Sequence, residues 1–223
     1  MIFEAAATSS TDLQPIVHVV DDDAAFRDAL SDLLASADLE CRTYASTEEL
    51  LATPLAERPS CLILDVQMPG GSGLELQAHL NNLGEKLPII FMTGYGDVES
   101  CARAMKRGAI EFLTKPFRQE DMLEAISIAL AGDRARRVEV ARRSVVERLL
   151  ATLTKREAEV LWLVVEGLAN KQIAKKMGIA EVTVKLHRGN VMQKMEASSL
   201  ADLVRKASVL SDPPLNTLAH RRE

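Results

Sequence analysis

The stretch "CLILDVQMPG", residues 61–70, places four apolar residues directly before a carboxylate and a Met-Pro-Gly turn. A short apolar run bounded by turn residues is typical of a buried strand. Such a strand would carry Asp65 to the surface at its end. A single acid at this position means little, because Asp commonly opens a turn by bonding to its own backbone. The rest of the chain therefore decides whether Asp65 is a turn residue or a site.

The unit around Asp65 recurs through the first half of the chain. Four further short runs, at 16–20, 40–44, 88–93 and 111–115, alternate with amphipathic stretches such as "AAFRDALSDLLASA". Strands that alternate five times with helices indicate a parallel sheet covered by helices on both faces.

Chemically useful side chains follow four of the five expected strands. They are Asp21 and Asp22, Asp65, Thr93, and Lys115. Because ligands bind beyond the carboxyl ends of the strands in an open parallel sheet, we expect these side chains to meet at one edge. Service as turn caps would explain any one of them, but it does not explain the whole set.

This set of residues predicts a particular chemistry. Three carboxylates in one pocket repel each other unless a cation neutralises them, and oxygen ligands with open positions suit Mg²⁺. A carboxylate at such a site can attack phosphorus and form an aspartyl-phosphate. The hydroxyl of Thr93 and the ammonium of Lys115 would then bind phosphoryl oxygens.

Length and composition describe an ordinary protein of two domains. The chain has 223 residues and three widely spaced cysteines, so we expect neither a disulfide framework nor a zinc site. No window resembles a membrane span or a signal peptide, which favours the cytoplasm and no membrane partner. Residues 1–14 and 211–223 are expected to be mobile tails.

The charge is divided unevenly along the chain. Residues 15–130 carry 9 Lys and Arg against 19 Asp and Glu, whereas residues 131–223 carry 18 against 11. The basic half is therefore the one expected to meet a polyanion, although two solvated faces would give the same balance.

The sequence pattern of the second half predicts helices and no strands. Residues 131–149 predict an Arg-rich helical linker with an apolar seam of Val138, Ala141, Val145 and Leu149. This linker could hold two domains apart, shield a DNA-binding face or pair two chains.

A helix-turn-helix is predicted after the linker. Asn170 is the expected N-cap of a helix that runs through Met177 and ends at Gly178, and a second helix begins near Glu181. On the second helix an inward stripe is expected from Val184, His187, Val191 and Met195.

Residues 15–130 resemble the receiver domain of bacterial two-component response regulators, on the motifs "VVDDD", "LDVQMPG", "MTGYGD" and "LTKPF". The resemblance implies a doubly wound sheet of order 2-1-3-4-5 with Asp65 as phosphoacceptor. Asp21 and Asp22 would hold Mg²⁺ together with Asp65 and the main-chain carbonyl of Gln67. Thr93, Lys115 and the aromatic Phe112 would form the switch, and the Lys115-Pro116 bond would be cis.

Residues 150–210 resemble the LuxR-type DNA-binding domain, on "LTKREAEVL" and "GLANKQIAKKMGIAEVTVKLHRGNVMQKM". Lys185 and Leu186 face away from the inward stripe, so they are expected to reach base edges. The expected phosphate contacts are Thr183 and Arg188, with Lys171 and Lys194 as weaker candidates. His187 fits either a packed core residue or a phosphate contact.

Together the two resemblances imply the FixJ subgroup of response regulators. The implied function is a transcriptional regulator, more often an activator, whose Asp65 is phosphorylated by a sensor histidine kinase. The implied partners are promoter DNA, RNA polymerase and a second copy after phosphorylation. An aspartyl-phosphate hydrolase is the rival reading, but Gln67 stands where the haloacid-dehalogenase pattern has a second acid. A DNA-binding protein with a silent receiver is the other rival.

Overall fold

The computed structural model describes residues 14–55, 57–69, 71–94 and 98–210. The expected tails, apart from Gln14, lie outside these residues. The chain divides into two compact units, residues 1–138 and 139–223. One helix crosses from the first unit to the second, so the expected domain limits of 15–130, 131–149 and 150–210 stay predictions.

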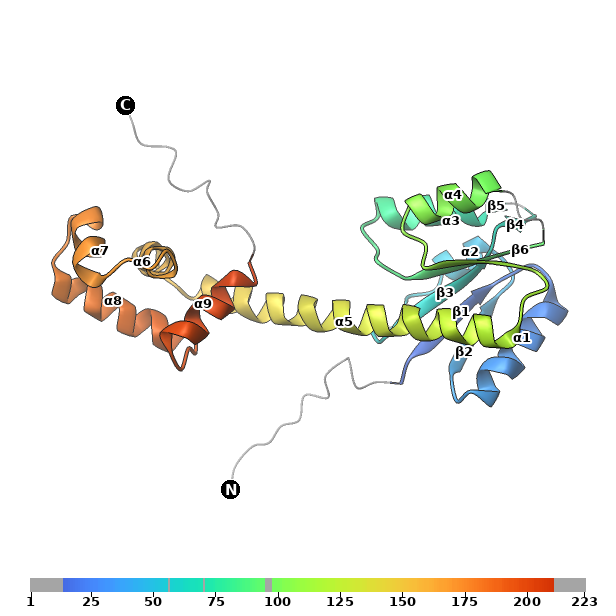
Figure 1. Cartoon of the computed structure of the whole chain (residues 1–223), viewed down its shortest axis with the longest axis horizontal. Helices are drawn as coiled ribbons and strands as arrows, with labels where there is room; N and C mark the ends of the chain where they lie inside the picture. Colours follow the sequence, from blue (N-terminus) through green and yellow to red (C-terminus); the bar gives the residue numbers. More distant parts are fainter. Residues whose placement is uncertain (1–13, 56, 70, 95–97, 211–223) are drawn as a thin grey trace, which may run out of the picture. The chain divides into compact units, whose positions relative to one another are not determined.

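The first unit is built on a parallel five-stranded sheet (Figure 1). Its strands are β1 (Ile16–Val20), β2 (Glu40–Tyr44), β3 (Ser60–Asp65), β6 (Ile89–Thr93) and β7 (Glu111–Thr114). They lie in the order β2-β1-β3-β6-β7. Because β6 and β7 are the fourth and fifth strands of this sheet along the chain, the expected order 2-1-3-4-5 is confirmed.

Five helices of the first unit cover the two faces of the sheet. These helices are α1 (Ala24–Ser36), α2 (Thr47–Leu51), α3 (Gly73–Asn82), α4 (Val98–Lys106) and α5 (Gln119–Ala151). Helices α1 and α5 pack on one face, over Val17 and Ile63, whereas α2, α3 and α4 pack on the other, over Leu62 and Phe91. The central strand β3 is therefore buried on both sides, which explains its unbroken apolar run.

A short antiparallel pair follows β3, formed by β4 (Gln67–Met68) and β5 (Gly71–Ser72). The sequence indicated a turn here but not these paired bridges. The pair returns the chain so that α3 starts directly behind Asp65, and the Gly73 N–H donates to the Val66 carbonyl at 3.1 Å.

Helix α5 is 33 residues long and is fastened to the start of β3 by a buried carboxylate. Asp133 accepts a hydrogen bond from the Ser60 backbone N–H at 3.0 Å. Its two oxygens also bind the guanidinium groups of Arg136 and Arg137. Because hydrogen bonds from these three partners compensate a fully buried charge, Asp133 fixes α5 against the sheet at the end opposite Asp65.

The second unit packs four helices, together with the end of α5, around its own apolar core. They are α6 (Lys155–Val165), α7 (Asn170–Met177), α8 (Glu181–Lys194) and α9 (Leu200–Ser208). Val184, Val191 and Met195 are buried in this core as expected, and His187 is half-buried. Among the described helices of the whole chain, none has the length and apolarity that a bilayer crossing needs.

The start of α7 differs from the prediction. The N-cap is Ala169, and Asn170 is already the first helical residue. The Ala169 methyl cannot accept a hydrogen bond, but the Gln172 side chain reaches back and accepts from the Ala169 N–H at 2.8 Å. Asn170 is thereby available to accept from Arg188 on α8 at 2.8 Å. Gly178 ends the helix in the left-handed conformation, as expected.

Helix α6 is tied to α8 by an ion pair between a buried glutamate and a half-buried lysine. Glu157 accepts from the Lys194 ammonium at 2.6 Å and from the Thr154 backbone N–H at 2.9 Å. These contacts, the Lys194 bond first, lower the pKa of Glu157 to about 2. The pair joins residues 37 positions apart in the sequence.

Glu157→Gln should remove a specific acid sensitivity of the second unit. A depressed carboxyl pKa contributes stability that is present above the ordinary value of 4.5 and is lost as pH falls toward 2. We expect the variant to be about 1–3 kcal/mol less stable at pH 7 and flatter between pH 5 and 2. Trp162, the only tryptophan, lies on α6 and reports this unit selectively by fluorescence. Equal pH dependence of unfolding in the two proteins would contradict the assignment.

Candidate functional site

Three carboxylates meet at the carboxyl edge of the sheet. Asp21 follows β1, Asp22 is next to it, and Asp65 ends β3. Each offers an oxygen, and these three atoms all lie within 4.8 Å of one another. Asp21 and Asp65 are buried, whereas Asp22 is exposed. The sequence-based expectation that these acids converge is therefore confirmed.

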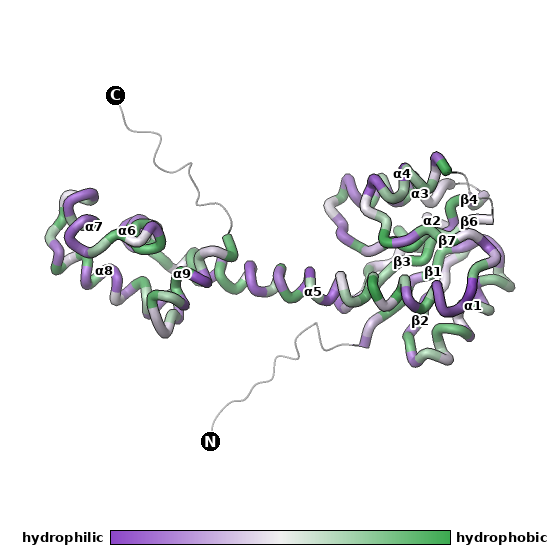
Figure 2. Tube along the Cα trace, viewed as in Figure 1, coloured by the Kyte–Doolittle hydropathy of each residue, from purple (hydrophilic) through white to green (hydrophobic). Residues whose placement is uncertain are grey.

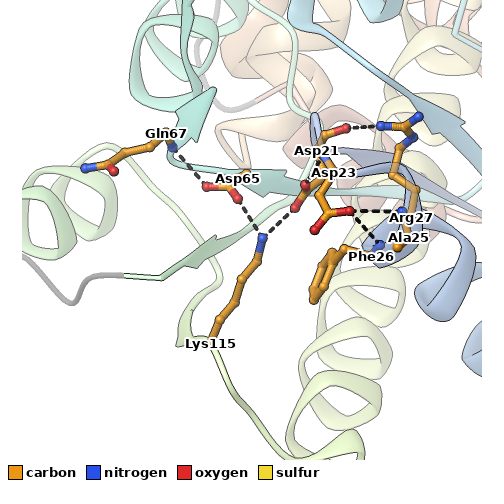
Figure 3. Close-up of polar contacts among 8 residues, drawn as sticks. All are labelled: Asp21, Asp23, Ala25, Phe26, Arg27, Asp65, Gln67 and Lys115. Carbon is orange, nitrogen blue, oxygen red and sulfur yellow. Dashed lines mark hydrogen bonds and ion pairs between the residues drawn. The ribbon is translucent and has the colours of Figure 1, made fainter. Parts of the chain in front are cut away.

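Lys115 reaches into this cluster from the end of β7 (Figure 3). Its ammonium lies 2.6 Å from an oxygen of Asp21 and 2.6 Å from an oxygen of Asp65. The Lys115 backbone N–H donates to the Thr93 carbonyl at 2.7 Å, and the Lys115-Pro116 bond is cis as expected. The ammonium also lies 3.9 Å from the centre of the Phe26 ring.

Each buried carboxylate divides its oxygens between backbone and lysine. One oxygen of Asp65 accepts from the Gln67 N–H at 2.9 Å, and one oxygen of Asp21 accepts from the Asp23 N–H at 2.9 Å. The other oxygen of each binds Lys115. This arrangement fixes both carboxylate planes before any ligand arrives.

Burial and charge act in opposite directions on the pKa values of this cluster. Burial raises the pKa of Asp65, and the bonds from Lys115 and the Gln67 N–H only partly offset this effect. Burial lowers the pKa of Lys115, but its bonds to Asp21 and Asp65 outweigh burial and raise it. The lysine is therefore held as a cation between two acids.

The donor set fits a hard divalent cation. Three carboxylates within one coordination sphere supply negative oxygens, and Asp22 leaves the cluster open to solvent. The Gln67 backbone N–H donates to Asp65 in this structure. The role of the Gln67 carbonyl as a metal ligand stays a prediction. A cation would share the carboxylate oxygens to which Lys115 donates here.

Two of the three expected switch residues, Thr93 and Phe112, lie on the neighbouring strands β6 and β7. Thr93 is buried at the end of β6. Phe112 on β7 is half-buried, and its ring centre lies 6.2 Å from that of Phe91 on β6. Strands β6 and β7 pair here, with Phe91 opposite Phe112 and Thr93 opposite Thr114.

Three residues near the cluster were missed by sequence reasoning. Phe26 lies against Lys115, and Arg27 donates to the Asp21 carbonyl at 2.7 Å. Both belong to the first turn of α1, where the apolar and basic periodicity of a surface helix gives no sign of a site. The third, Gly73, has no functional group at all.

Gly73 matters because of what it leaves free. A methyl group built on its backbone would lie 2.3 Å from the Asp65 carbonyl oxygen and 2.9 Å from the Leu64 side chain. Both distances are far below van der Waals contact. The first residue of α3 is therefore packed directly against the backbone that carries the phosphoacceptor candidate.

The second unit presents its own polar surface on α7 and α8. An open hollow of about 560 Å³ is lined by Ala169, Asn170, Lys171, Glu181, Lys185 and Arg188. Lys185 is exposed and pairs loosely with Glu181 at 3.8 Å, and Leu186 beside it is 64% exposed. An exposed lysine and leucine side by side on a helix have the chemistry to contact base edges, a guanine acceptor and a thymine methyl respectively.

The remaining expected DNA contacts differ in how free they are. Lys171 is exposed, and Thr183 is half-buried. Arg188 is half-buried and already donates to Asn170, and Lys194 is paired with Glu157. The Nδ1 atom of His187 is buried and has no hydrogen-bond partner among the described residues. Of the basic residues expected to contact phosphates, Lys171 is thus the most available.

Two family models match the chain, one in each unit. Residues 17–127 match the response regulator receiver domain. Residues 151–207 match the bacterial regulatory proteins of the luxR family.

Similar proteins span nearly the whole chain. Nodulation protein W of Bradyrhizobium diazoefficiens is 47% identical over 87% of this chain and 86% of its own length. Transcriptional regulatory protein FixJ of Azorhizobium caulinodans is 42% identical, with 89% and 94% covered. The solved structure of response regulator StyR has a TM-score of 0.80 at 46% identity and covers 88% of this chain and 99% of its own.

Gly73→Ala should strain the site from behind. The added methyl overlaps the Asp65 backbone, so we expect the first unit to lose about 1–3 kcal/mol of stability. The control is Gly132→Ala on α5, where a methyl meets nothing within 4 Å and helix propensity should add up to about 1 kcal/mol. Chemical denaturation followed by circular dichroism measures both. A Gly73→Ala protein as stable as the natural chain would refute the close packing.

Proposed function

Because this chain belongs to the two-component response regulators that join a receiver domain to a LuxR-type DNA-binding domain, we propose that Mg²⁺-dependent phosphorylation of Asp65 switches its activity as a transcriptional activator. A receiver domain implies a sensor kinase as partner, and the second domain implies DNA. We assign the phosphoryl donor to a sensor histidine kinase and the DNA to promoter sites, with the protein in the cytoplasm. The observation that carries the proposal is the convergence of Asp21, Asp22, Asp65 and Lys115.

Asp65 is the residue positioned to act as nucleophile. One of its oxygens is held by the Gln67 N–H, so the other can be directed at phosphorus once Lys115 shifts toward the incoming phosphoryl oxygens. The bond from phosphorus to the donor imidazole nitrogen breaks as the bond to the Asp65 oxygen forms, and the imidazole takes a proton from solvent. Bound Mg²⁺ would neutralise charge on the phosphoryl oxygens during this transfer.

Asp21, Asp22 and Asp65, with the Gln67 carbonyl, are the residues that would hold Mg²⁺. With the charge of these acids neutralised by the bound cation, the ammonium of Lys115 would be available to a phosphoryl oxygen. The Thr93 hydroxyl would bind a second phosphoryl oxygen from the end of β6. Lys115 already contacts Asp65 at 2.6 Å, which limits the reorganisation that its part in the transfer would require.

Phe112 would convert this event into a change of surface. Movement of Thr93 toward the phosphoryl group vacates space beside β7, and the Phe112 ring next to Phe91 can fill it. The altered face of α4, β7 and α5 would then favour a homodimer. A dimer of helix-turn-helix domains fits DNA half-sites about one helical turn, roughly 34–36 Å, apart. An activator would also contact RNA polymerase.

We do not assign a turnover reaction to this site. Gln67 stands two residues after Asp65, where an aspartyl-phosphate hydrolase of the haloacid-dehalogenase pattern carries a second acid. An amide cannot act as a general base there. The chain would accept a phosphoryl group and lose it slowly.

Asp65→Asn should abolish labelling by acetyl phosphate. The amide keeps the shape of the side chain but lacks the anionic oxygen, and removal of Mg²⁺ with a chelator should likewise abolish labelling of the natural chain. Asp28→Asn, an exposed change on α1, should label normally. Labelling is followed by intact-protein mass spectrometry. Labelling of Asp65→Asn at the natural rate would show that the phosphoacceptor lies elsewhere.

Removing a residue that contacts bases and removing one that contacts phosphates should affect DNA affinity differently. Lys185→Ala should cost about 1–3 kcal/mol on a duplex selected from a random pool and little on a scrambled one. Lys171→Ala should weaken both duplexes alike and flatten the salt dependence by about one unit. Lys171 is the better comparison than Arg188, whose truncation would also remove the bond to Asn170. Equal losses on both duplexes for Lys185→Ala would contradict its assignment to base edges.

A further inference from the structure

Helix α5 exposes apolar residues on a face that the fold of either unit does not use. Ile128 is 56% exposed, Val138 is 40% exposed and Val145 is 44% exposed. The smaller Ala131 and Ala135, between them in sequence, are exposed as well. Figure 2 shows hydrophobic and hydrophilic residues alternating along this helix.

The exposed apolar face of α5 lies opposite the side of the helix that packs on the sheet. Met122, Ile126, Ala129 and Asp133 are buried against the sheet. At about 100° per residue, Ala131, Ala135 and Val138 fall on the side directly away from these residues. The exposed face therefore takes no part in the packing of the first unit. Burial in that unit does not explain why this face carries apolar residues.

The spacing of the exposed residues is that of a coiled coil. Ile128, Ala131, Ala135, Val138, Arg142 and Val145 follow one another at alternating intervals of three and four. They occupy the a and d positions of consecutive heptads, beginning with Ile128 at a. The seam ends there, because Leu149 packs into the core of the second unit.

The residues flanking this seam complement each other. Arg134 occupies a g position and Glu139 the following e position. In two parallel helices in register, the g residue of one helix faces the following e residue of the other. Arg134 is positive and Glu139 is negative. A parallel pairing therefore forms two such ion pairs, which are related by the symmetry of the dimer. An antiparallel pairing would not place Arg134 opposite Glu139 in this way.

We propose that residues 128–145 of α5 pair with the same segment of a second copy of this chain as a parallel two-stranded coiled coil. The seam spans about 27 Å of helix. Its core is weak, because two of its six positions are alanine and one is Arg142, so it needs a second contact to hold a dimer. It rests on the proposed function in one respect, since the phosphorylated receiver would supply that second contact and the two would reinforce each other.

Disulfide trapping in the full-length chain tests the seam directly. Val138→Cys places a thiol at a d position, where two parallel helices bring the side chains together. Val140→Cys is the matched control, because Val140 is equally apolar and 56% exposed but lies about 200° around the helix. The natural chain, with its three free cysteines, sets the background. With acetyl phosphate and Mg²⁺ present, we expect covalent dimers from Val138→Cys only. Equal cross-linking at both positions, or none at position 138, would overturn the proposal.

A charge exchange tests the parallel register. Arg134→Glu should raise the dissociation constant of the dimer about tenfold, because two attractive pairs become repulsive. Adding Glu139→Arg should restore it, whereas Glu139→Arg alone should weaken pairing like the first change. Sedimentation velocity gives the dimer fractions. Failure of the double variant to recover would overturn the register.

Repeating the trapping with Asp65→Asn distinguishes the two proposals. Cross-linking at position 138 that persists in Asp65→Asn supports the seam and removes its dependence on phosphorylation. Normal phosphorylation of the natural chain without cross-linking at position 138 refutes the seam and leaves the proposed function standing.

Discussion

Mutual repulsion among three carboxylates is the constraint on which the rest of this structure depends. Oxygens of Asp21, Asp22 and Asp65 within 4.8 Å of one another require positive charge, and Lys115 provides it from the far strand of the sheet. A parallel sheet of this order is what brings the end of β7 to the ends of β1 and β3. A cation or phosphoryl group bound at these oxygens would compete with the contacts that Lys115 makes to Asp21 and Asp65. The site is thus built to respond to charge.

The strand that carries Asp65 is held at both ends. Behind Asp65, α3 begins at Gly73, in contact with the Asp65 backbone. At the start of β3, the Ser60 N–H is bound by Asp133 on α5. A change at Asp65 therefore acts on a strand fixed to the same helix that continues into the second unit. In that unit the pair of Glu157 and Lys194 fixes α8 against α6, so that its exposed residues are presented on a firm support.

The sequence predicted the features that follow from local pattern. Apolar runs located all five strands of the main sheet within about one residue, and the acids at their ends predicted the cluster. The strand order came from resemblance to a family, because hydrophobic pattern does not define neighbours in a sheet. Gly178 predicted a helix end by its backbone freedom, but the N-cap of α7 was misplaced by one residue because Gln172 caps from within the helix. The ion pair of Lys194 and the close packing of Gly73 were not predicted for another reason. They depend on Glu157 and Asp65, which lie next to them only after tertiary packing.

We propose above all that this acid cluster takes a divalent cation and a phosphoryl group together. Fluorine NMR of the full-length chain with beryllofluoride, a phosphoryl mimic, tests it most directly. With Mg²⁺ we expect resonances of protein-bound fluoride that disappear when the metal is chelated. Absence of bound resonances at saturating Mg²⁺, or identical resonances without the metal, would contradict the account.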